Sequence, residues 1–397
     1  MNLQIEKLYK IASKSNRNII GLMSGTSLDG LDIVYCNISG TGRHTDVNIK
    51  SFDSLSYDKE VKDKIRLVFA QENVNFPYLV MLNEWLGSLH AGMVNNYLAK
   101  NNIPKDEVDA IASHGQTVMH VPAHQHGNTA FENATLQIGD GDHIAVKTGI
   151  ITISDFRQKH IAAGGEGAPL AVYGDYLIFS KIGEDRIMLN IGGISNFTYL
   201  PGDNEAMSVF VTDTGPGNTL MDVWMNTYFD KSFDENAEIA RQGHVNWKFL
   251  SALKEHYFFD LGFPRTTGPE VFNIEYIQQA LKKSDQKHIS HENVMATLNR
   301  FSAETIAEAI KSNFGDQIMY IYLSGGGAHN PLLVDTLQEL LPVCLFNKCD
   351  VLGIAGDSKE AVLFAVLANE TLAGSPIDFG TRRGVPGVCM GKISFPV

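Results

Sequence analysis

A strand, a glycine-containing turn and a second strand follow one another twice in this chain of 397 residues. The first copy has the apolar runs NIIGLM (18–23) and LDIVYCNI (31–38), joined by SGTSLDG, and the second is RIMLNIGGISNFTYL (186–200). Glycine hairpins are common, so one repeat is a weak signal, but two halves that open in the same way indicate two similar domains facing each other. The length agrees, because a single hydrophobic core stops growing at about 250–300 residues. We therefore expect two domains with a ligand cleft between them.

Short β-rich runs alternate with amphipathic segments along the chain, which is the pattern of an α/β protein. Beyond the two hairpins, we expect a strand at 47–57, a helix at 77–100, a strand at 109–117, and a strand, turn and helix at both 208–229 and 319–341. No low-complexity linker separates these segments, so ordinary turns near residues 150 and 356 should connect the domains. The predicted N-terminal domain combines 1–150 with 356–397, and the predicted C-terminal domain spans 151–355.

The composition argues against several classes of protein. An apolar fraction of 44% with 19% charged residues is typical of a globular soluble chain, and a formal net charge of −13 offers no basic surface to nucleic acid. The start of the chain lacks the features of a signal peptide, and no apolar run approaches the roughly 18 residues of a membrane helix. The four cysteines show no CxxC spacing, which favours reduced thiols over a metal site. We expect a cytoplasmic protein whose partner is neither nucleic acid nor membrane.

Three glycine-rich turns, SGTSLDG, TDTGPGN and SGGGAHNP, each lie where a predicted strand ends. Glycine at such a place lets backbone N–H groups approach an anion, and a helix that begins just afterward adds its positive end. Any one of these turns by itself is more simply a tight hairpin or a helix cap. Together they indicate nucleotide binding, although none is a Walker loop or a dinucleotide fingerprint.

The first turn carries side chains suited to a phosphate and its metal. The hydroxyls of Ser24, Thr26 and Ser27 can bond phosphate oxygens, and Asp29 or Asp32 can hold Mg²⁺ directly or through water. A second carboxylate for the metal comes from Asp213, at the end of its own predicted strand. Hydroxyls and carboxylates at strand ends suit phosphoryl transfer, in which the protein chiefly positions groups and neutralises charge. We therefore expect ATP and Mg²⁺ as cofactors.

Eight blocks in order resemble the anhydro-N-acetylmuramic acid kinase family: GLMSGTSLDGLD, SHGQTVMH, TLQIGD, SDFRQKHIAAGGEGAPL, NIGGISN, DTGPGN, LSGGGAHNP and DSKEAVLFA. The resemblance runs from about residue 18 to the C-terminal end. It implies the fold of acetate and sugar kinases, heat-shock ATPases and actin, in which two ribonuclease-H-like domains enclose the active site. It also implies a cytoplasmic bacterial enzyme of peptidoglycan recycling, usually a homodimer. Such kinases use ATP, Mg²⁺ and water to open the 1,6-anhydro bridge of the sugar and phosphorylate O6, giving N-acetylmuramic acid 6-phosphate and ADP.

The matching blocks imply a set of site residues. The ATP-binding residues are Gly25, Thr26, Ser27, Leu28, Asp29, Gly30, Leu31 and Asp32 in the first turn, Asp213, Thr214, Gly215, Gly217 and Asn218 in the second, and Gly325, Gly326, Gly327 and Asn330 in the third. Asp29 and Asp213 are the expected metal ligands. The substrate-binding residues are His114, Gln116, Arg157, Gly165, Pro169, Asn196 and Glu360. For Glu360, a favourable acid in the first turn of a helix is an equally good explanation.

The block at 154–170 departs from the family at two positions. His160 stands where the family has the aspartate that accepts a proton from the attacking water, and Glu166 replaces a glutamine. A neutral imidazole can accept that proton at pH 7, and a carboxylate could hold its other nitrogen. We therefore predict that His160 is the base and Glu166 its orienting partner. The alternative is that His160 fills a polar cleft in a protein that has lost hydrolytic kinase activity.

Two other functions remain open at this level. A kinase of another sugar is one, because Arg265 and Pro269 also depart from the family pattern in a segment that could contact the substrate or a second subunit. A nucleotide-dependent binding or chaperone-like protein without phosphoryl transfer is the other. The persistence of SHGQT and GGEGAPL argues against it, since a protein that only senses nucleotide has little need of them.

Overall fold

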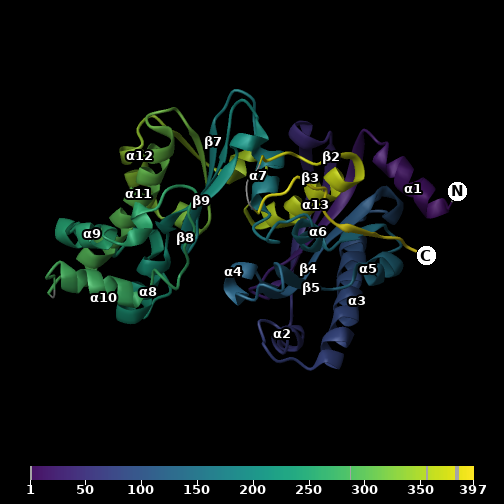
Figure 1. Ribbon diagram of the computed structural model, residues 1–397, viewed down its shortest axis with the longest axis horizontal. Coiled ribbons are helices and arrows are strands. Elements are labelled where there is room, and N and C mark those ends of the chain that lie inside the picture. The colour runs from purple at the N-terminus through teal and green to yellow at the C-terminus, as the bar shows by residue number, and fades with distance from the viewer. Residues whose placement is uncertain (1, 287, 355, 381–383) are drawn as a thin grey trace. The chain divides into compact units, whose positions relative to one another are not determined.

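The chain folds around two separate sheets, one in each of two units (Figure 1). The computed structural model describes residues 2–286, 288–354, 356–380 and 384–397. Unit 1 comprises Met1–Phe179 with Gly353–Val397, and unit 2 comprises Ser180–Leu352. No helix among these described residues is long and apolar enough to cross a membrane.

Unit 1 has a mixed sheet with helices on its faces. Its strands are β1 (Asn16–Ser24), β2 (Gly30–Ser39), β3 (Asp46–Ser56), β4 (Ala110–Val121), β5 (Ala134–Ile138), β6 (Thr152–Ser154) and β12 (Lys392–Ser394). Its helices are α1 (Leu3–Ala12), α2 (Lys59–Arg66), α3 (Phe76–Lys100), α4 (Ala123–His126), α5 (Gly141–Thr148), α6 (Phe156–Ala162), α7 (Ala171–Phe179) and α13 (Lys359–Ala373). The strands lie in the order β12-β6-β4-β1-β2-β3, and β5 pairs with β4.

Unit 2 has the strands β7 (Arg186–Ile191), β8 (Ile194–Leu200), β9 (Phe210–Pro216), β10 (Tyr320–Ser324) and β11 (Leu345–Lys348). Its helices are α8 (Thr219–Phe229), α9 (Trp247–Lys254), α10 (Ile274–Lys283), α11 (His291–Phe314) and α12 (Pro331–Leu340). The strands lie in the order β11-β10-β7-β8-β9.

The two sheets share one topology, which confirms the duplication that the sequence indicates. In unit 1 the antiparallel strands β1, β2 and β3 are extended on the other side of β1 by the parallel strands β4 and β6. In unit 2, β7, β8 and β9 are antiparallel neighbours, and β10 and β11 continue parallel to β7. Each unit is therefore a ribonuclease-H-like α/β domain, as expected.

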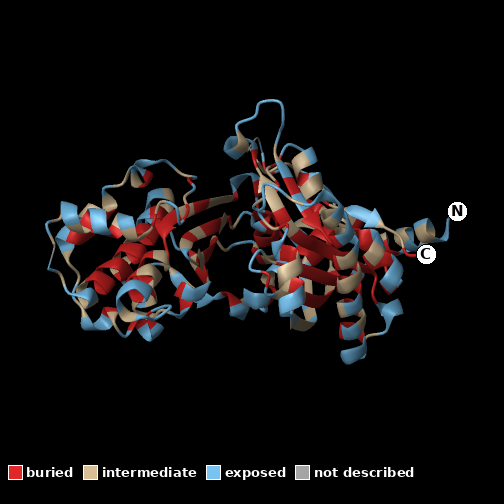
Figure 2. Cartoon of the chain, turned by 90° about the horizontal axis from the view of Figure 1, so that it is seen from below, coloured by how far each residue is buried: buried red, intermediate tan, exposed pale blue. Residues whose placement is uncertain are grey.

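Close packing of α13 on β1 places the start of this helix beside the first glycine-rich turn. Gly21 of β1 allows the approach, because a Cβ at this position would lie 2.0 Å from the carbonyl oxygen of Ala361. Most of α13 is buried, and Figure 2 shows the same concentration of buried residues in the strands and inward helix faces of each unit. Each large apolar side chain buried here contributes about 1.5–3 kcal/mol to folding.

The observed boundary corrects the predicted domains. Residues 151–179 belong to unit 1, whereas we placed them in the C-terminal domain. The reason is strand pairing: β6 lies parallel to β4 and antiparallel to β12, so the segment after residue 150 completes the first sheet. The segment that carries the family's base position therefore folds with unit 1.

Candidate active site

The turn between β1 and β2 has both exposed polar residues and buried leucines. Thr26, Ser27 and Asp29 are exposed, so hydroxyl and carboxylate groups face solvent there. Leu28 and Leu31 are buried in the core of unit 1, although both belong to the predicted ATP-binding set. Leu28 also has a φ of 59°, a left-handed conformation that costs a non-glycine residue of order 1 kcal/mol or more. These two leucines anchor the turn, and only their backbone could meet a phosphate.

Gln116 holds the start of this turn in place through two hydrogen bonds. Its Oε1 accepts a hydrogen bond from Ser24 Oγ at 2.6 Å, and its Nε2 donates to the carbonyl of Gly25 at 3.1 Å. The hydroxyl of Tyr57 donates to Ser24 Oγ at 3.0 Å, which completes a buried chain of polar groups. Because Gln116 is 0% exposed, it supports the turn; the structure does not give it the predicted direct contact with substrate.

Arg157 of α6 joins β4 to the loop that follows α6. Its Nε donates to His114 Nε2 at 2.8 Å, and its Nη1 donates to the carbonyl of Gly167 at 2.7 Å. Burial, aided by the Arg157 charge, lowers the pKa of His114 to about 3, so this imidazole is neutral. His114 is itself buried, and its role here is to hold Arg157 rather than to contact a ligand as predicted.

His160 has both ring nitrogens engaged. Nδ1 accepts a hydrogen bond from the N–H of Gly167 at 2.9 Å, so the ring proton must reside on Nε2. Nε2–H then donates to the Tyr173 hydroxyl at 3.1 Å, and this hydroxyl donates to the carbonyl of Pro386 at 2.8 Å. The ring is 0% exposed and lies against Gly165, where a Cβ would come within 2.3 Å of it. His160 is a satisfied core histidine.

These contacts correct the predicted roles of His160 and Glu166. Burial, aided by the Arg157 charge, lowers the pKa of His160 to about 4, and no nitrogen lone pair faces solvent. Glu166 does not hold the ring: its Oε1 lies 4.0 Å from Nδ1 of His124, and the side chains of His124 and Glu166 are 63% and 47% exposed. Pro169, also predicted at the substrate, is exposed at the end of the same loop.

Carboxylates gather where the first turn meets the start of α13. Loss of hydration raises the pKa of Asp32, and the negative charges of Asp357 and Asp29 raise it further. Glu360, in the first turn of α13, also has a raised pKa through loss of hydration, opposed by the attraction of Arg157. Glu360 is exposed, and the groups that shift its pKa all belong to unit 1. The negative charge of Glu360 in turn favours the charged form of Arg157.

Unit 2 carries a row of polar residues at one level of its sheet. Asn190 of β7 pairs with Ser324 of β10 on one side and with Asn196 of β8 on the other, and Asn196 pairs in turn with Asp213 of β9. Directly paired residues share a face, so these four side chains form one polar line. Asp213 Oδ2 accepts a hydrogen bond from the N–H of Thr267 at 2.8 Å. Asn190 and Ser324 were not among the predicted site residues, because only the strand register brings them into this line.

Backbone N–H groups of the TDTGPGN turn and of the residue after it are hydrogen-bonded within unit 2. The N–H groups of residues 217–219 donate to the carbonyls of Gly192 and Gly193 at 2.8 to 3.1 Å. They are therefore not free to cradle a phosphate, contrary to prediction. The exposed glycines near this turn are Gly325 and Gly326 of the third glycine-rich turn. In the second and third turns, the buried members of the predicted set are Thr214, Gly215, Gly217 and Gly327.

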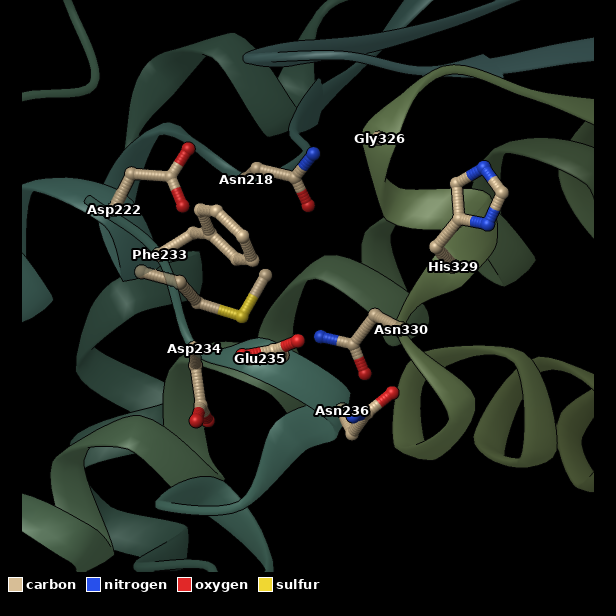
Figure 3. Close-up of a pocket in the computed structure, with 10 residues that line it drawn as sticks. Asn218, Asp222, Phe233, Asp234, Glu235, Asn236, Gly326, His329 and Asn330 are labelled. Atoms are coloured by element: carbon tan, nitrogen blue, oxygen red, sulfur yellow. The ribbon is translucent and has the colours of Figure 1, made fainter. Parts of the chain in front are cut away.

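A cavity of about 480 Å³ lies within unit 2, where the second and third glycine-rich turns meet (Figure 3). Its walls come from the start of α8, from the turn 233–236 and from the loop 326–330. Its lining residues are Asn218, Met221, Asp222, Phe233, Asp234, Glu235, Asn236, Gly326, His329 and Asn330. Three predicted ATP-binding residues are thus brought together, and the size lies in the usual range of small-molecule sites, about 300–1,000 Å³.

The cavity also contains residues that the sequence argument missed. Figure 3 shows the ring of Phe233 turned into it, and this side chain is 58% exposed. Asn330 Oδ1 accepts the N–H of Leu333 as the N-cap of α12. Its Nδ2 extends toward the cavity in Figure 3. No group of three or more His, Cys, Asp or Glu residues in the described parts of the chain is arranged to hold a metal ion.

Comparison with known proteins gives a consistent result. A sequence model of the family described as anhydro-N-acetylmuramic acid kinase matches residues 17–393. The anhydro-N-acetylmuramic acid kinase of Pseudoalteromonas atlantica is 53% identical over 400 residues, covering 100% of both chains. The protein of that name from Caldanaerobacter subterraneus is 35% identical, covering 98% of this chain and 100% of its own.

Similarity to solved structures is weaker. The activator of 2-hydroxyisocaproyl-CoA dehydratase from Clostridium difficile, with bound ADPNP, is 11% identical with a TM-score of 0.40, covering 90% of this chain and 96% of its own. Component A of (R)-2-hydroxyglutaryl-CoA dehydratase from Acidaminococcus fermentans is 10% identical with a TM-score of 0.41, covering 90% and 99%.

Proposed function

Because the chain belongs to the anhydro-N-acetylmuramic acid kinase family, we propose that it converts 1,6-anhydro-N-acetylmuramic acid, ATP and water to N-acetylmuramic acid 6-phosphate and ADP. The observation that carries the proposal is the match to this family over residues 17–393, with full-length relatives at 35–53% identity. The enzyme class, a sugar kinase, follows from the same match. Its place is the recycling of peptidoglycan fragments.

The unit 2 cavity is the proposed site of the nucleoside part of ATP. It combines the exposed aromatic ring of Phe233 with polar side chains that can bind the hydroxyl and amino groups of a nucleoside, and its volume is that of a small-molecule site. Gly326 lines the cavity, the preceding Gly325 is also exposed, and glycines at such a turn permit close approach of a phosphate chain. In unit 1, the exposed hydroxyls of Thr26 and Ser27 offer further hydrogen bonds to phosphate oxygens.

Mg²⁺ fits the carboxylates that are present. This ion usually keeps several waters and takes only one or two protein carboxylates together with substrate phosphates, so a dedicated cage of ligands is not required. Asp29 is exposed, and Asp213 has one oxygen engaged with Thr267 while the other can bind an ion or its water. When bound, the ion neutralises charge that develops on the transferring phosphoryl group. Asp29 and Asp213 are the residues proposed to hold it.

The proposed reaction needs a base in the sugar site. The oxygen of water bonds to the anomeric carbon, the bond between that carbon and O6 breaks, O6 bonds to the γ-phosphorus, and ADP leaves. The water gives up one proton, which a side chain must accept. His160 cannot accept it in this structure, because Gly167 occupies its Nδ1 lone pair and its Nε2 already carries hydrogen.

We propose Glu360 as this base. Its carboxylate has a raised pKa, which makes it a stronger proton acceptor than an ordinary glutamate, and it remains accessible to solvent. Arg157 stabilises the ionised form by its charge and is itself held by His114. His160 keeps a supporting role. It accepts a hydrogen bond from the N–H of Gly167, and the carbonyl of Gly167 accepts one from Arg157 Nη1, so His160 helps to position Arg157.

The proposal also includes a cytoplasmic location and a homodimer, both from the family resemblance. Gel filtration with light scattering tests the homodimer. Two alternatives are kept. One is a kinase of another sugar, and the other is a nucleotide-dependent binding protein without phosphoryl transfer.

ADP release tests the function and the base together. Purified wild type, Glu360→Gln and His160→Asn are compared with ATP, Mg²⁺ and the anhydro sugar between pH 5 and 9. We expect sugar-dependent ADP release from wild type, and a loss of about 10²–10⁴-fold in kcat for Glu360→Gln, because that is the usual contribution of a general base. The asparagine can still accept the Gly167 N–H, so His160→Asn should retain most activity in folded protein.

Other outcomes separate the alternatives. If His160→Asn is inactive while Glu360→Gln turns over normally, the base is His160 and our assignment is wrong. Release of ADP only with a different sugar supports the first alternative. Binding of ATP without turnover on any sugar supports the second.

A further inference from the structure

Asp222 is a carboxylate without a compensating charge on the wall of the unit 2 cavity. It lies in the first turns of α8, directly after the TDTGPGN turn, and its side chain is half-buried. Burial alone raises its pKa to about 6, with no contribution from a neighbouring cation. Neither the proposed phosphate contacts nor the proposed metal ligands use it, so its hydrogen-bonding capacity is open to a ligand.

The chemistry of Asp222 selects one part of a nucleotide. An ionised carboxylate only accepts hydrogen bonds, so it repels phosphate oxygens and attracts O–H and N–H groups. Figure 3 shows its carboxylate and the Phe233 ring both turned into the cavity. A nucleobase is flat and aromatic and stacks on such a ring. The part of the nucleotide between base and phosphates is ribose, whose 2′- and 3′-hydroxyls form an adjacent pair of donors.

We propose that Asp222 accepts hydrogen bonds from the ribose hydroxyls of the bound nucleotide, with the base on Phe233, and thereby selects ribonucleotides over 2′-deoxyribonucleotides. The inference rests on the proposed function only in taking ATP as the nucleotide. The two oxygens of one carboxylate match the two neighbouring hydroxyls of one ribose, and hydrogen bonds to a charged group are stronger than those between neutral groups.

The other acids of the cavity do not fit this role. Asp234 is buried, and its two oxygens accept the backbone N–H groups of Ile239 and Ala240 at 2.9 Å. Glu235 is exposed on the turn, where competition from water weakens a hydrogen bond to ligand. Glu235 therefore provides a matched control: it is an acid on the same cavity, outside the proposed ribose contact.

Equilibrium binding of ATP, 2′-deoxy-ATP and 3′-deoxy-ATP, measured by calorimetry without sugar, tests the inference on wild type, Asp222→Ala and Glu235→Gln. Wild type should bind ATP at least about tenfold more tightly than 2′-deoxy-ATP, because a hydrogen bond to a charged group contributes more than one between neutral groups. Asp222→Ala should lower the affinity for ATP by at least that factor, and it should bring the ratio of the affinities for ATP and 2′-deoxy-ATP close to one. Glu235→Gln should leave the ratio unchanged. Circular dichroism and thermal melting check that each variant is folded.

Equal affinity of wild type for ATP and both deoxy analogues would overturn the inference, as would an Asp222→Ala variant that weakens all three nucleotides by the same factor. A 3′-deoxy effect without a 2′-deoxy effect would refute the proposed selection against 2′-deoxyribonucleotides. The kinase proposal fails separately, if ATP binds with this discrimination but no sugar stimulates ADP release. Absence of any nucleotide binding would refute both.

The pH dependence of binding gives a second readout. Lowering the pH from 7 to 5 protonates Asp222, whose pKa is about 6, and a neutral carboxyl is a weaker acceptor. His329, Glu235 and Asp234 also line the cavity, so the diagnostic quantity is the difference between wild type and Asp222→Ala. ATP affinity should fall more steeply with acidification in wild type. Parallel pH curves would count against the ribose contact.

Discussion

The neutral, buried ring of His160 should make unit 1 sensitive to acid at a pH far above that of ordinary carboxylate titration. In the folded state the pKa of His160 is about 4, compared with about 6.5 in the unfolded chain. Between these values the unfolded chain binds the proton and the folded chain does not. Stability is therefore lost as the pH falls from about 6.5 toward 4, and it changes little above pH 7.

The magnitude follows from the shift of the pKa. A difference of about 2.5 pKa units corresponds to about 3 kcal/mol over the whole range, and to about 2 kcal/mol between pH 7 and pH 5. His90 and His114, also buried in unit 1, have pKa values of about 4 and about 3 and act in the same direction. A comparison with a variant that lacks only the His160 ring isolates its part.

The assay is urea unfolding of unit 1 at pH 7 and pH 5, in wild type and His160→Asn. Trp85 lies in unit 1 and the other tryptophans, Trp224 and Trp247, lie in unit 2, so replacing these two by Phe leaves a fluorescent probe for unit 1. We expect wild type to lose about 2 kcal/mol more than His160→Asn on acidification. An equal loss in both proteins would show that the His160 ring does not cause the acid sensitivity of unit 1.

Nitrogen NMR of the imidazole checks the same point directly. The ring of His160 should show the Nε2–H tautomer, because Gly167 N–H occupies Nδ1. It should not titrate between pH 5 and 8. A midpoint near 6.5, or an Nδ1–H tautomer, would mean that the ring is free and available as the catalytic base.

Three further perturbations test the site. The acid limb of kcat should lie above the ordinary glutamate pKa of 4.5, because Glu360 must be ionised to act and its pKa is raised; a limb at or below 4.5 in the pH–rate profile would exclude it. Replacing Gln116 by Leu should destabilise unit 1 by about 1–3 kcal/mol in urea unfolding and raise KM for ATP, because the Ser24 hydroxyl and the Gly25 carbonyl lose their buried partner. Gly165→Ala should lower Tm by several degrees, since its Cβ would lie 2.3 Å from the His160 ring, and His160→Ala in the same chain should recover part of that loss.

The family and the α/β duplication could both be predicted from the sequence. The strand predicted at 18–23 is β1 at Asn16–Ser24, and the helix predicted at 77–100 is α3 at Phe76–Lys100. Such elements are local: strand and helix periods, glycine turns and capping residues such as Asn75 act over a few neighbouring positions. The order of family blocks added the enzyme class.

The role of each polar residue in the site depends on contacts that form only when the chain folds. His160 has the right chemistry for a base, but the groups that saturate it come from Gly167, Tyr173 and Pro386, the last of them far along the chain. The nucleotide cavity likewise joins the start of α8, the turn 233–236 and the loop 326–330, with no local pattern to mark Asp222 or Phe233. Burial and hydrogen-bond saturation depend on neighbours brought together by folding, and these properties decide whether a titratable group is free to react.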